Sequence, residues 1–481
     1  MKTVYTKKSL YILVIIFILS LKCIGTSLAF QFQPGVLPLP DQLKYQPLQF
    51  KLPQAQQKVL SNGISLHIVE DHELPLVKIT VLVRVGNVDD PLDKEGLAEL
   101  TGKVMLTGGT LSMSGDEVDE SLAFMAADIR CSVNLEYTLF TLSVLKKDMD
   151  SALEIFSQIL KHPAFEQAKF QVARDLKVEE LRRISDNPAD LAFRQYRKLI
   201  YKGDRRGRLA NFASLDKIAR QDLMTFHEAF FSPQNVMLTV SGDITNEEAL
   251  AKLNRHLGSW RKGNCDRGKL SPPVGGQTYS LSLISKETPQ SIIIYGHHGP
   301  AVNHPDFYPF TVLDFIVGSG GFRSRMFQEV RTKRGLAYSS GSFYLGRKDY
   351  GIFEAYAFTK ADSTAQVLTI MKDIIKKIQV EEINPAEIRW AKNAIQNNFI
   401  FTFKTADDVA FQQMMLKYQE LPSDFLETYR EKFEAVKAED VKIMASKYLD
   451  LQKAIILVVG PEKEFDSPIS IFGPVNREDI F

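Results

Sequence analysis

The sequence predicts an α+β protein of two tandem homologous domains, each a mainly antiparallel sheet with helices packed on it. The first observation is an internal repeat. Residues 218–243, IARQDLMTFHEAFFSPQNVMLTVSGD, match residues 436–461, VKAEDVKIMASKYLDLQKAIILVVGP, at a constant offset of 218. Each copy has the pattern of an amphipathic helix, a turn, a β-rich strand and a closing glycine. Between the copies lies a stretch dense in Gly, Pro and charge, which is typical of a linker.

The chain begins with a predicted export signal. Residues 1–29 carry four lysines, no acid and the apolar run LYILVIIFILSL, which is too short to span a bilayer and is typical of a signal peptide. We expect cleavage after Ala29, followed by an extended segment over residues 30–54. Loss of the signal lowers the formal charge of the 481-residue chain from +1 to −3, so we expect no nucleic-acid partner. The rest of the sequence has no comparable apolar run, so we expect no membrane insertion of the mature chain.

The first predicted domain covers residues 55–262. GISLHIVED (63–71) and LVKITVLVRVG (76–86) alternate as half-buried strands do, and GLAELTGKVMLTGGT (96–110) contains the first long helix. A further strand is predicted at SVNLEYTLFTLSVL (132–145). Its sequence suits either pairing with an extended peptide at a sheet edge or packing in the core.

A linker over 263–280 and a second domain over 281–481 complete the predicted chain. The second domain opens with SIIIYGHHG (291–299) and a helix through FYPFTVLDFIVG (307–318). A later helix places apolar residues on one face, which indicates core: Val367, Ile370, Met371, Ile374, Ile375 and Ile378. His297, His298 and His304 are expected in a turn-like segment, as surface or hydrogen-bonded histidines.

Several stretches, in order along the chain, resemble the insulinase (pitrilysin) family of zinc peptidases, of the short two-domain type that includes mitochondrial processing peptidase. They are VLSNGISLHIVEDHELPLVKITVLVRVG, GLAELTGKVMLTGGT, SVNLEYTLFTLSVLKKDMDSALEI, FFSPQNVMLTVSGDI and GGFRSRMFQEVRTKRGLAYSSGSFY. The resemblance spans nearly all of the predicted mature chain. It implies a LuxS/processing-peptidase-like metallopeptidase fold.

Active members of this family carry HxxEH on the first long helix, where two imidazoles bind zinc and the Glu is the general base. Aligned on Gly-Leu-Ala, this sequence has Glu99, Gly102 and Lys103 at those positions. Glycine offers no base, and a protonated lysine repels a dication. Glu180 follows Lys103 after 76 residues, a spacing close to the family's, so it matches the downstream zinc ligand. We therefore expect no metal in this chain.

The second domain keeps other residues of the family's site. In RTKRGLAY, Arg331 and Tyr338 match the Arg and Tyr that the family places over the zinc site from its second domain. A guanidinium and a phenol hydroxyl are suited to stabilise the negative charge that develops on a carbonyl oxygen. The loop Gly318-Ser319-Gly320-Gly321 resembles the glycine-rich loop of the processing-peptidase α subunit and is a candidate wall of the peptide chamber; a helix end is an equally plain explanation of its glycines.

Three functions remain open from the sequence. The first is a non-catalytic subunit of a heterodimeric zinc endopeptidase, with Arg331 and Tyr338 acting in trans on a partner that has HxxEH and holds the zinc, and with extended or unfolded polypeptides as substrates. The second is a retired scaffold or peptide-binding subunit of a non-peptidase complex. The third is an altered metallopeptidase that uses Glu99 and Glu180. The expected location is a bacterial periplasm, with secretion as the alternative.

Overall fold

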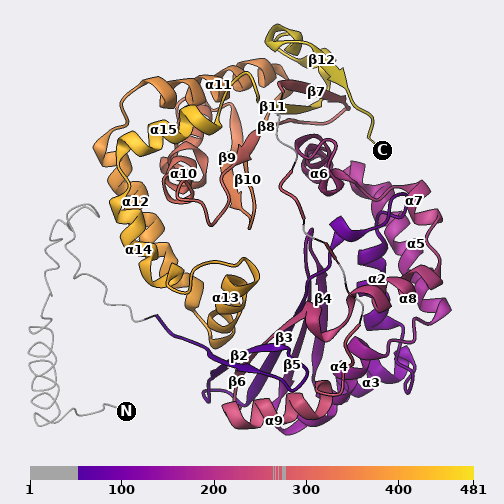
Figure 1. The fold of residues 1–481 in the computed structure, drawn as a ribbon. Helices are drawn as coiled ribbons and strands as arrows, with labels where there is room; N and C mark the ends of the chain where they lie inside the picture. The colour runs from indigo at the N-terminus through magenta and orange to yellow at the C-terminus, as the bar shows by residue number, and fades with distance from the viewer. Residues whose placement is uncertain (1–51, 264, 266, 269, 274–277, 481) are drawn as a thin grey trace, which may run out of the picture. The chain divides into compact units, whose positions relative to one another are not determined.

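The computed structural model describes residues 52–263, 265, 267–268, 270–273 and 278–480. The predicted signal peptide and all but the last three residues of the predicted extended segment lie outside this range. The described part of the chain contains two six-stranded sheets with helices packed on them (Figure 1). The prediction of two similar α+β halves is confirmed.

The first sheet has the strand order β1-β2-β6-β3-β5-β4. Only the β2–β6 pair is parallel. Its strands are β1 Gln56–Val59, β2 Ser65–Glu70, β3 Leu76–Val83, β4 Asp128–Val133, β5 Thr138–Leu145 and β6 Val236–Gly242. The helices of this half are α2 Leu97–Thr107, α3 Gly115–Phe124, α4 Met149–Lys161, α5 Gln167–Arg183, α6 Pro188–Ile200, α7 Phe212–Asp216, α8 Arg220–Phe230 and α9 Asn246–Leu257.

The second sheet has the order β12-β7-β11-β8-β10-β9, with β11 and β12 each parallel to β7. Its strands are β7 Ser280–Ser285, β8 Ser291–Gly299, β9 Ala337–Gly346, β10 Gly351–Thr359, β11 Ile455–Gly460 and β12 Val475–Arg477. The helices are α10 Phe307–Asp314, α11 Thr364–Val380, α12 Pro385–Phe399, α13 Ala406–Tyr418, α14 Phe425–Ala435 and α15 Ala438–Tyr448, with two π-helical segments, η7 Phe315–Ser319 and η9 Phe327–Thr332.

The sequence repeat is visible in the elements. Helices α8 and α15 have bounds that differ by 218 at both ends, and they precede β6 and β11, the strands that lie between β2 and β3 and between β7 and β8. Apart from β1 and β12, the two sheets therefore have the same strand order. The repeat in sequence is a repeat in topology.

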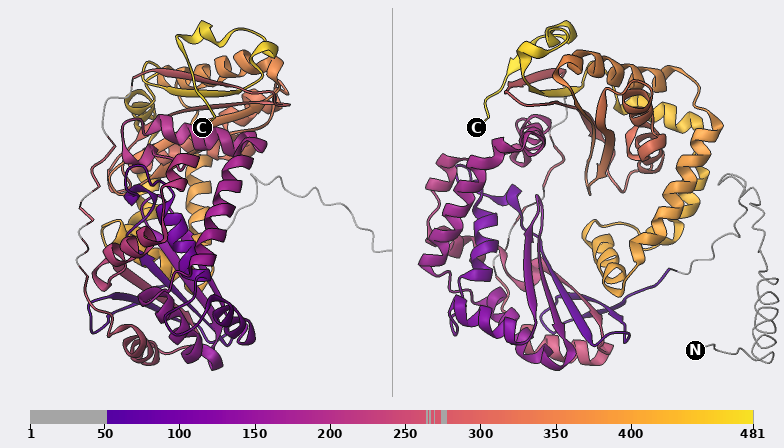
Figure 2. Two further views of the ribbon diagram at one scale, coloured as in Figure 1. Left: turned by 90° about the vertical axis from the view of Figure 1, so that its right-hand side faces the viewer. Right: turned by 180° about the vertical axis from the view of Figure 1, so that it is seen from behind.

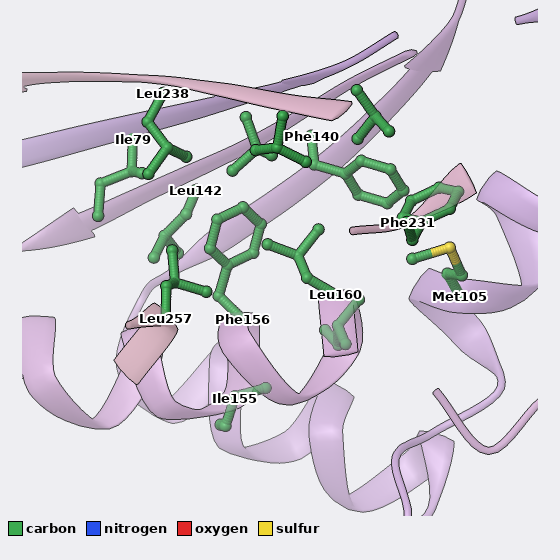
Figure 3. Packing of buried hydrophobic residues seen from close by; sticks show 14 of the residues in the cluster. Ile79, Met105, Phe140, Leu142, Ile155, Phe156, Leu160, Phe231, Leu238 and Leu257 are labelled. Atoms are coloured by element: carbon green, nitrogen blue, oxygen red, sulfur yellow. The ribbon is translucent and has the colours of Figure 1, made fainter. Parts of the chain in front are cut away.

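The core of the first half lies between its sheet and the helices on one side of it (Figures 1 and 2). Strand β5 alternates strictly between buried and partly buried residues, so Phe140 and Leu142 point to the helices. There they meet Phe156 of α4 and Leu257 of α9 (Figure 3). Each fully buried side chain of this size contributes roughly 1.5–3 kcal/mol.

One helix of each half packs on the sheet of the other half, and the two helices occupy equivalent positions in the repeat. Helix α6 packs on β8 and β11 of the second sheet, whereas α13 packs on β2 and β6 of the first (Figure 1). The bounds of these helices also differ by 218. Tyr196 of α6 donates a hydrogen bond to the backbone oxygen of Ile455 at 3.1 Å, and Met414 of α13 packs against Leu82 and Met237. Each half thus contributes one helix to the core of the other half. The predicted domain bounds stay predictions.

Two local predictions are wrong. Residues 132–145 form the end of β4, a turn and β5, because the backbone N–H of Asn134 bonds the oxygen of Tyr137 at 2.9 Å. Strand β5 lies inside the sheet, and β4 is the edge. His297 and His298 lie in β8 and not in a turn. Gly296 before them packs closely, since a Cβ there would lie 2.4 Å from the Tyr196 hydroxyl.

Candidate functional site

Helix α2 carries the three positions that match HxxEH. It begins after Gly96, whose φ of 104° lies in the left-handed region that favours glycine. The carboxylate of Asp90 accepts hydrogen bonds from the backbone N–H groups of Gly96 and Ala98, each at 2.7 Å. Burial raises the pKa of Asp90 to about 7, although these two N–H groups act to lower it. The start of the helix is therefore fixed by a buried side chain.

Glu99 of α2 and Glu180 of α5 share one lysine. The ammonium Nζ of Lys177 lies 2.5 Å from Oε2 of Glu99 and 2.8 Å from Oε1 of Glu180. Asn87 donates a further hydrogen bond to Glu99 at 2.8 Å. Burial opposes ionisation of Glu99, but Lys177 and Asn87 outweigh it and the pKa of Glu99 is lowered. One side-chain cation thus bridges both carboxylates that match zinc-ligand positions.

Removing this cation is expected to destabilise the protein by roughly 1–3 kcal/mol, because Lys177→Met leaves Glu99 partly buried without its counter-ion. Since the pKa of Glu99 is lowered below its ordinary 4.5, its contribution is present above that value and is lost as the pH falls through the lower folded-state pKa. Urea unfolding at about pH 7 and about pH 4 measures both effects. The variant should lose less stability on acidification than wild type.

The matched control for Lys177→Met is the double variant with Glu99→Gln. Neutralising the abandoned carboxylate should recover part of the lost stability. Equal unfolding free energies for wild type and Lys177→Met at neutral pH would contradict the role of this ion pair.

Gly102 is buried where α2 packs against β4. A Cβ at this position would lie 2.7 Å from Sγ of Cys131 and 3.0 Å from Cγ2 of Val133. Cys131 is a free thiol, and burial raises its pKa to about 12. The thiol therefore stays protonated at neutral pH, and its role is to pack against α2. The position that matches the general base of HxxEH has no side chain and no room for one.

Gly102→Ala is expected to destabilise the protein by roughly 1 kcal/mol, because overpacking costs about 1–3 kcal/mol and the better helix propensity of alanine offsets only about 1 kcal/mol. The cost should be smaller in a Cys131→Ala background, where the nearest atom is gone. Chemical denaturation of the four proteins of this cycle gives the coupling energy. Strictly additive costs would show that Cys131 is not the obstacle.

These residues do not fit a zinc ion. Zinc sites in proteins use three or four imidazole, thiolate or carboxylate ligands, whereas this position offers two carboxylates already bridged by an ammonium, a glycine and the exposed Lys103. Across the described residues, no group of three or more His, Cys, Asp or Glu side chains is arranged to hold a metal. Within the same part of the chain, no helix is both long and apolar enough to cross a membrane.

Arg331 and Tyr338 are brought together by a π-helix and a β-bulge. Arg331 lies on η9, and its guanidinium carbon is 4.4 Å from the ring centroid of Tyr338 and 4.7 Å from that of Phe327. In the β9–β10 register Ser339 opposes Phe358 and Ala337 opposes Thr359, which leaves Tyr338 as the extra residue.

The bulge turns Tyr338 outward, so that 76% of its surface is exposed. The nearby acid Glu329 binds Lys333 and Arg334 instead of Arg331. The partly buried guanidinium of Arg331 therefore lies beside the exposed phenol ring of Tyr338.

The glycines of the Gly318–Gly321 loop have different surroundings. Gly318 ends against β9, where a Cβ would lie 2.2 Å from the backbone nitrogen of Ser342, and a Cβ on Gly320 would lie 2.4 Å from Trp390. Gly321 has a φ of +65° and open space beside it. Ser319 hydrogen-bonds the buried Asp314. Close packing explains the first two glycines, and the role of the loop in a peptide chamber stays a prediction.

The structure forms two separate clusters from the predicted site residues. No hydrogen bond, ion pair or ring contact among the described residues joins Glu99, Lys177 and Glu180 to Arg331 or Tyr338. Sequence reasoning missed Lys177 and Cys131. The lysine had a visible signal, since it lies three positions before Glu180 on one helix and so shares its face. Cys131 had none, because only the packing of β4 on α2 brings it to Gly102.

Two family models match this chain. The model described as Insulinase (Peptidase family M16) matches residues 67–210, and the model described as Peptidase M16 inactive domain matches residues 217–395. The chain belongs to the insulinase family, peptidase family M16, and it includes a domain of the inactive type. The resemblance read from the sequence is confirmed.

Relatives and solved structures agree with this assignment. An uncharacterized zinc protease of Rickettsia bellii is 25% identical over 417 residues, covering 84% of this chain and 96% of that protein, and one of Rickettsia felis is 26% identical over 346 residues, covering 71% and 82%. The fold is similar to a peptidase M16 inactive domain from Pseudomonas fluorescens, with a TM-score of 0.77 at 22% identity over 85% of this chain and 98% of that one. A protease from Helicobacter pylori has a TM-score of 0.76 at 20% identity over 85% and 100%.

Proposed function

We propose that this chain is the non-catalytic subunit of a two-chain zinc endopeptidase of the insulinase family. One observation supports this more than any other. The position that matches the zinc site is filled by the ion pairs of Lys177 and the packing of Cys131 on Gly102, while Arg331 lies beside the exposed Tyr338. The chain has lost the groups that activate water and has kept the groups that bind an oxyanion.

In this proposal, Arg331 and Tyr338 bind the carbonyl oxygen of the scissile peptide bond. Negative charge develops on that oxygen as water adds, and a fixed guanidinium and phenol stabilise it more than they stabilise the neutral carbonyl. The guanidinium of Arg331 contacts the rings of both Tyr338 and Phe327. The donors are thus positioned before the charge appears.

The proposal requires a partner. We expect a paralogous chain with an intact HxxEH motif that holds the zinc ion and activates the water. The two chains would enclose an extended or unfolded polypeptide, with the Gly318–Gly321 loop at the chamber wall. The sequence-based expectation of export places this assembly in the periplasm of a Gram-negative bacterium, with secretion as the alternative.

Affinity purification of the tagged chain from its native host tests the partnership. The proposal predicts a stoichiometric second chain with HxxEH, and peptidase activity in the recovered complex. Recovery of the chain alone, or in a complex without any HxxEH protein, would contradict it.

A scaffold function is the second candidate. The fold is similar to a chain in the structure titled Complex III2 from Candida albicans, with a TM-score of 0.71 at 14% identity over 85% of this chain. A fold of this kind thus also occurs in an assembly that is not named a peptidase. On this reading Arg331→Ala would change nothing measurable in the complex.

A further inference from the structure

A cavity of about 850 Å³ in the first half lies between the end of α6 and the segments that precede α2 and α7. A volume of this size holds a small organic ligand in other proteins. Two cations of its lining have acid partners, since Lys198 lies 3.5 Å from Glu478 and Arg208 lies 3.9 Å from Glu95. The lining carries five cations in all: Arg194, Lys198, Lys202, Arg205 and Arg208.

The other three cations have no acid partner. Among the described residues, none forms an ion pair with Arg194, Lys202 or Arg205. Arg194 donates one hydrogen bond to the backbone oxygen of Ala210, and Arg205 is only partly exposed. Burial, followed by the nearby charge of Arg197, lowers the pKa of Arg194. The charged form of this guanidinium therefore lacks full compensation in the free protein.

The acids of the lining do not supply the missing partners. Besides Glu95, they are Asp93 and Asp204. Each of these two pairs with a cation outside the lining, Asp93 with Lys217 at 3.1 Å and Asp204 with Arg206 at 3.0 Å. Three unpaired cations therefore line one cavity.

A phosphate ester has the charge and the acceptors that these cations lack. Its phosphate group carries about two negative charges at neutral pH and three acceptor oxygens, and a guanidinium can bind two of those oxygens at once. A carboxylate carries a single charge, so it compensates less of the excess. A phosphate group alone fills only a small part of the cavity, and Leu92 and Leu209 of the same lining offer apolar surface to an organic remainder.

We propose that this pocket binds a phosphate monoester of a small organic molecule through Arg194, Lys202 and Arg205. The site goes beyond the proposed function and shares no residue with the pair Arg331 and Tyr338. Because the attraction is between charges at a partly open surface, raising the salt concentration should weaken binding.

Isothermal titration calorimetry on the full chain, without a partner, tests the site. The probes are glycerol 3-phosphate and glycerate, which carry a phosphate group and a carboxylate on a similar carbon skeleton. The proposal predicts saturable binding of one glycerol 3-phosphate per chain, at least about tenfold tighter than glycerate. Arg205→Ala and Lys202→Ala should each weaken it at least about tenfold.

The matched control is Arg389→Ala, at an exposed arginine of α12 that makes no ion pair with a described residue. It should bind glycerol 3-phosphate as wild type does. Arg205 makes no side-chain contact with a described residue, so circular dichroism should show a folded Arg205→Ala variant.

A lipid headgroup is the second source of the same chemistry, and vesicles that contain phosphatidic acid distinguish it. A headgroup ligand predicts that the wild-type chain floats with these vesicles and that Arg205→Ala does not, whereas a soluble ligand predicts binding of glycerol 3-phosphate alone. Absence of binding to both probes overturns the proposal. So does an affinity for glycerol 3-phosphate that equals that for glycerate, or that survives in both Arg205→Ala and Lys202→Ala. Since the assay involves no hydrolysis, such a failure leaves the oxyanion role of Arg331 standing.

Discussion

Arg331→Ala in the assembled two-chain peptidase is expected to lower kcat about 10²–10³-fold. The guanidinium acts only when charge develops on the carbonyl oxygen, so KM should change little. Tyr338→Phe removes the second donor while keeping the ring that lies 4.4 Å from the guanidinium, and it should lower kcat by a similar or smaller factor. Steady-state kinetics on a quenched peptide substrate measure both parameters.

Arg334→Ala is the matched control for this prediction. Arg334 lies on the same segment and pairs with Glu329, so its removal takes away a neighbouring cation without touching the donor pair. We expect its kcat to stay near wild type. If Arg331→Ala were also near wild type, or if Arg334→Ala fell by the same factor, the oxyanion role would be wrong.

Arg206→Ala is expected to destabilise the protein by about 3–5 kcal/mol. Only 2% of Arg206 is exposed, and its guanidinium donates to Glu136, Asp204 and the backbone oxygen of Ser271, each at 3.0 Å. It also lies 4.8 Å from the ring of Tyr350, whose hydroxyl donates to Glu136 at 3.0 Å. Removing the guanidinium leaves two carboxylates without their shared cation, between the two halves of the chain.

Two variants make the Arg206 result specific. Arg205→Ala removes the adjacent arginine, which makes no ion pair with a described residue, and should change stability by less than about 0.5 kcal/mol. Glu136→Gln in the Arg206→Ala background should recover part of the lost stability, because the buried carboxylate of Glu136 without its cation accounts for most of the destabilisation. Denaturant midpoints that are equal for Arg205→Ala and Arg206→Ala would contradict the account of this network.

The repeat made the fold predictable, because α8 with β6 and α15 with β11 carry the same local pattern twice. The packing of α6 on the second sheet and of α13 on the first was not predictable. An apolar helix face indicates that the helix packs against something, but it does not indicate which sheet. The turn at Asn134–Tyr137 was missed because no glycine or proline marks it. A turn was predicted around His297 and His298, although Gly296 packs against Tyr196 and Gly299 against Tyr344 and Phe310.

The candidate site was predictable where chemistry is local. Glu99, Gly102, Lys103 and Glu180 follow from the family motif, and the spacing of Lys177 to Glu180 follows from helix geometry. The outward position of Tyr338 depends on one extra residue in β9. The pairing register of β9 with β10 cannot be predicted from the sequence of β9 alone.

Metal content measured together with hydrolysis on the separated chains tests the central claim most directly. The account predicts that this chain, purified alone, holds no stoichiometric zinc and cuts no peptide, and that adding the HxxEH partner restores a cleavage rate that depends on Arg331. Tightly bound zinc in the isolated chain, lost on Glu180→Ala together with its own peptidase activity, would contradict it.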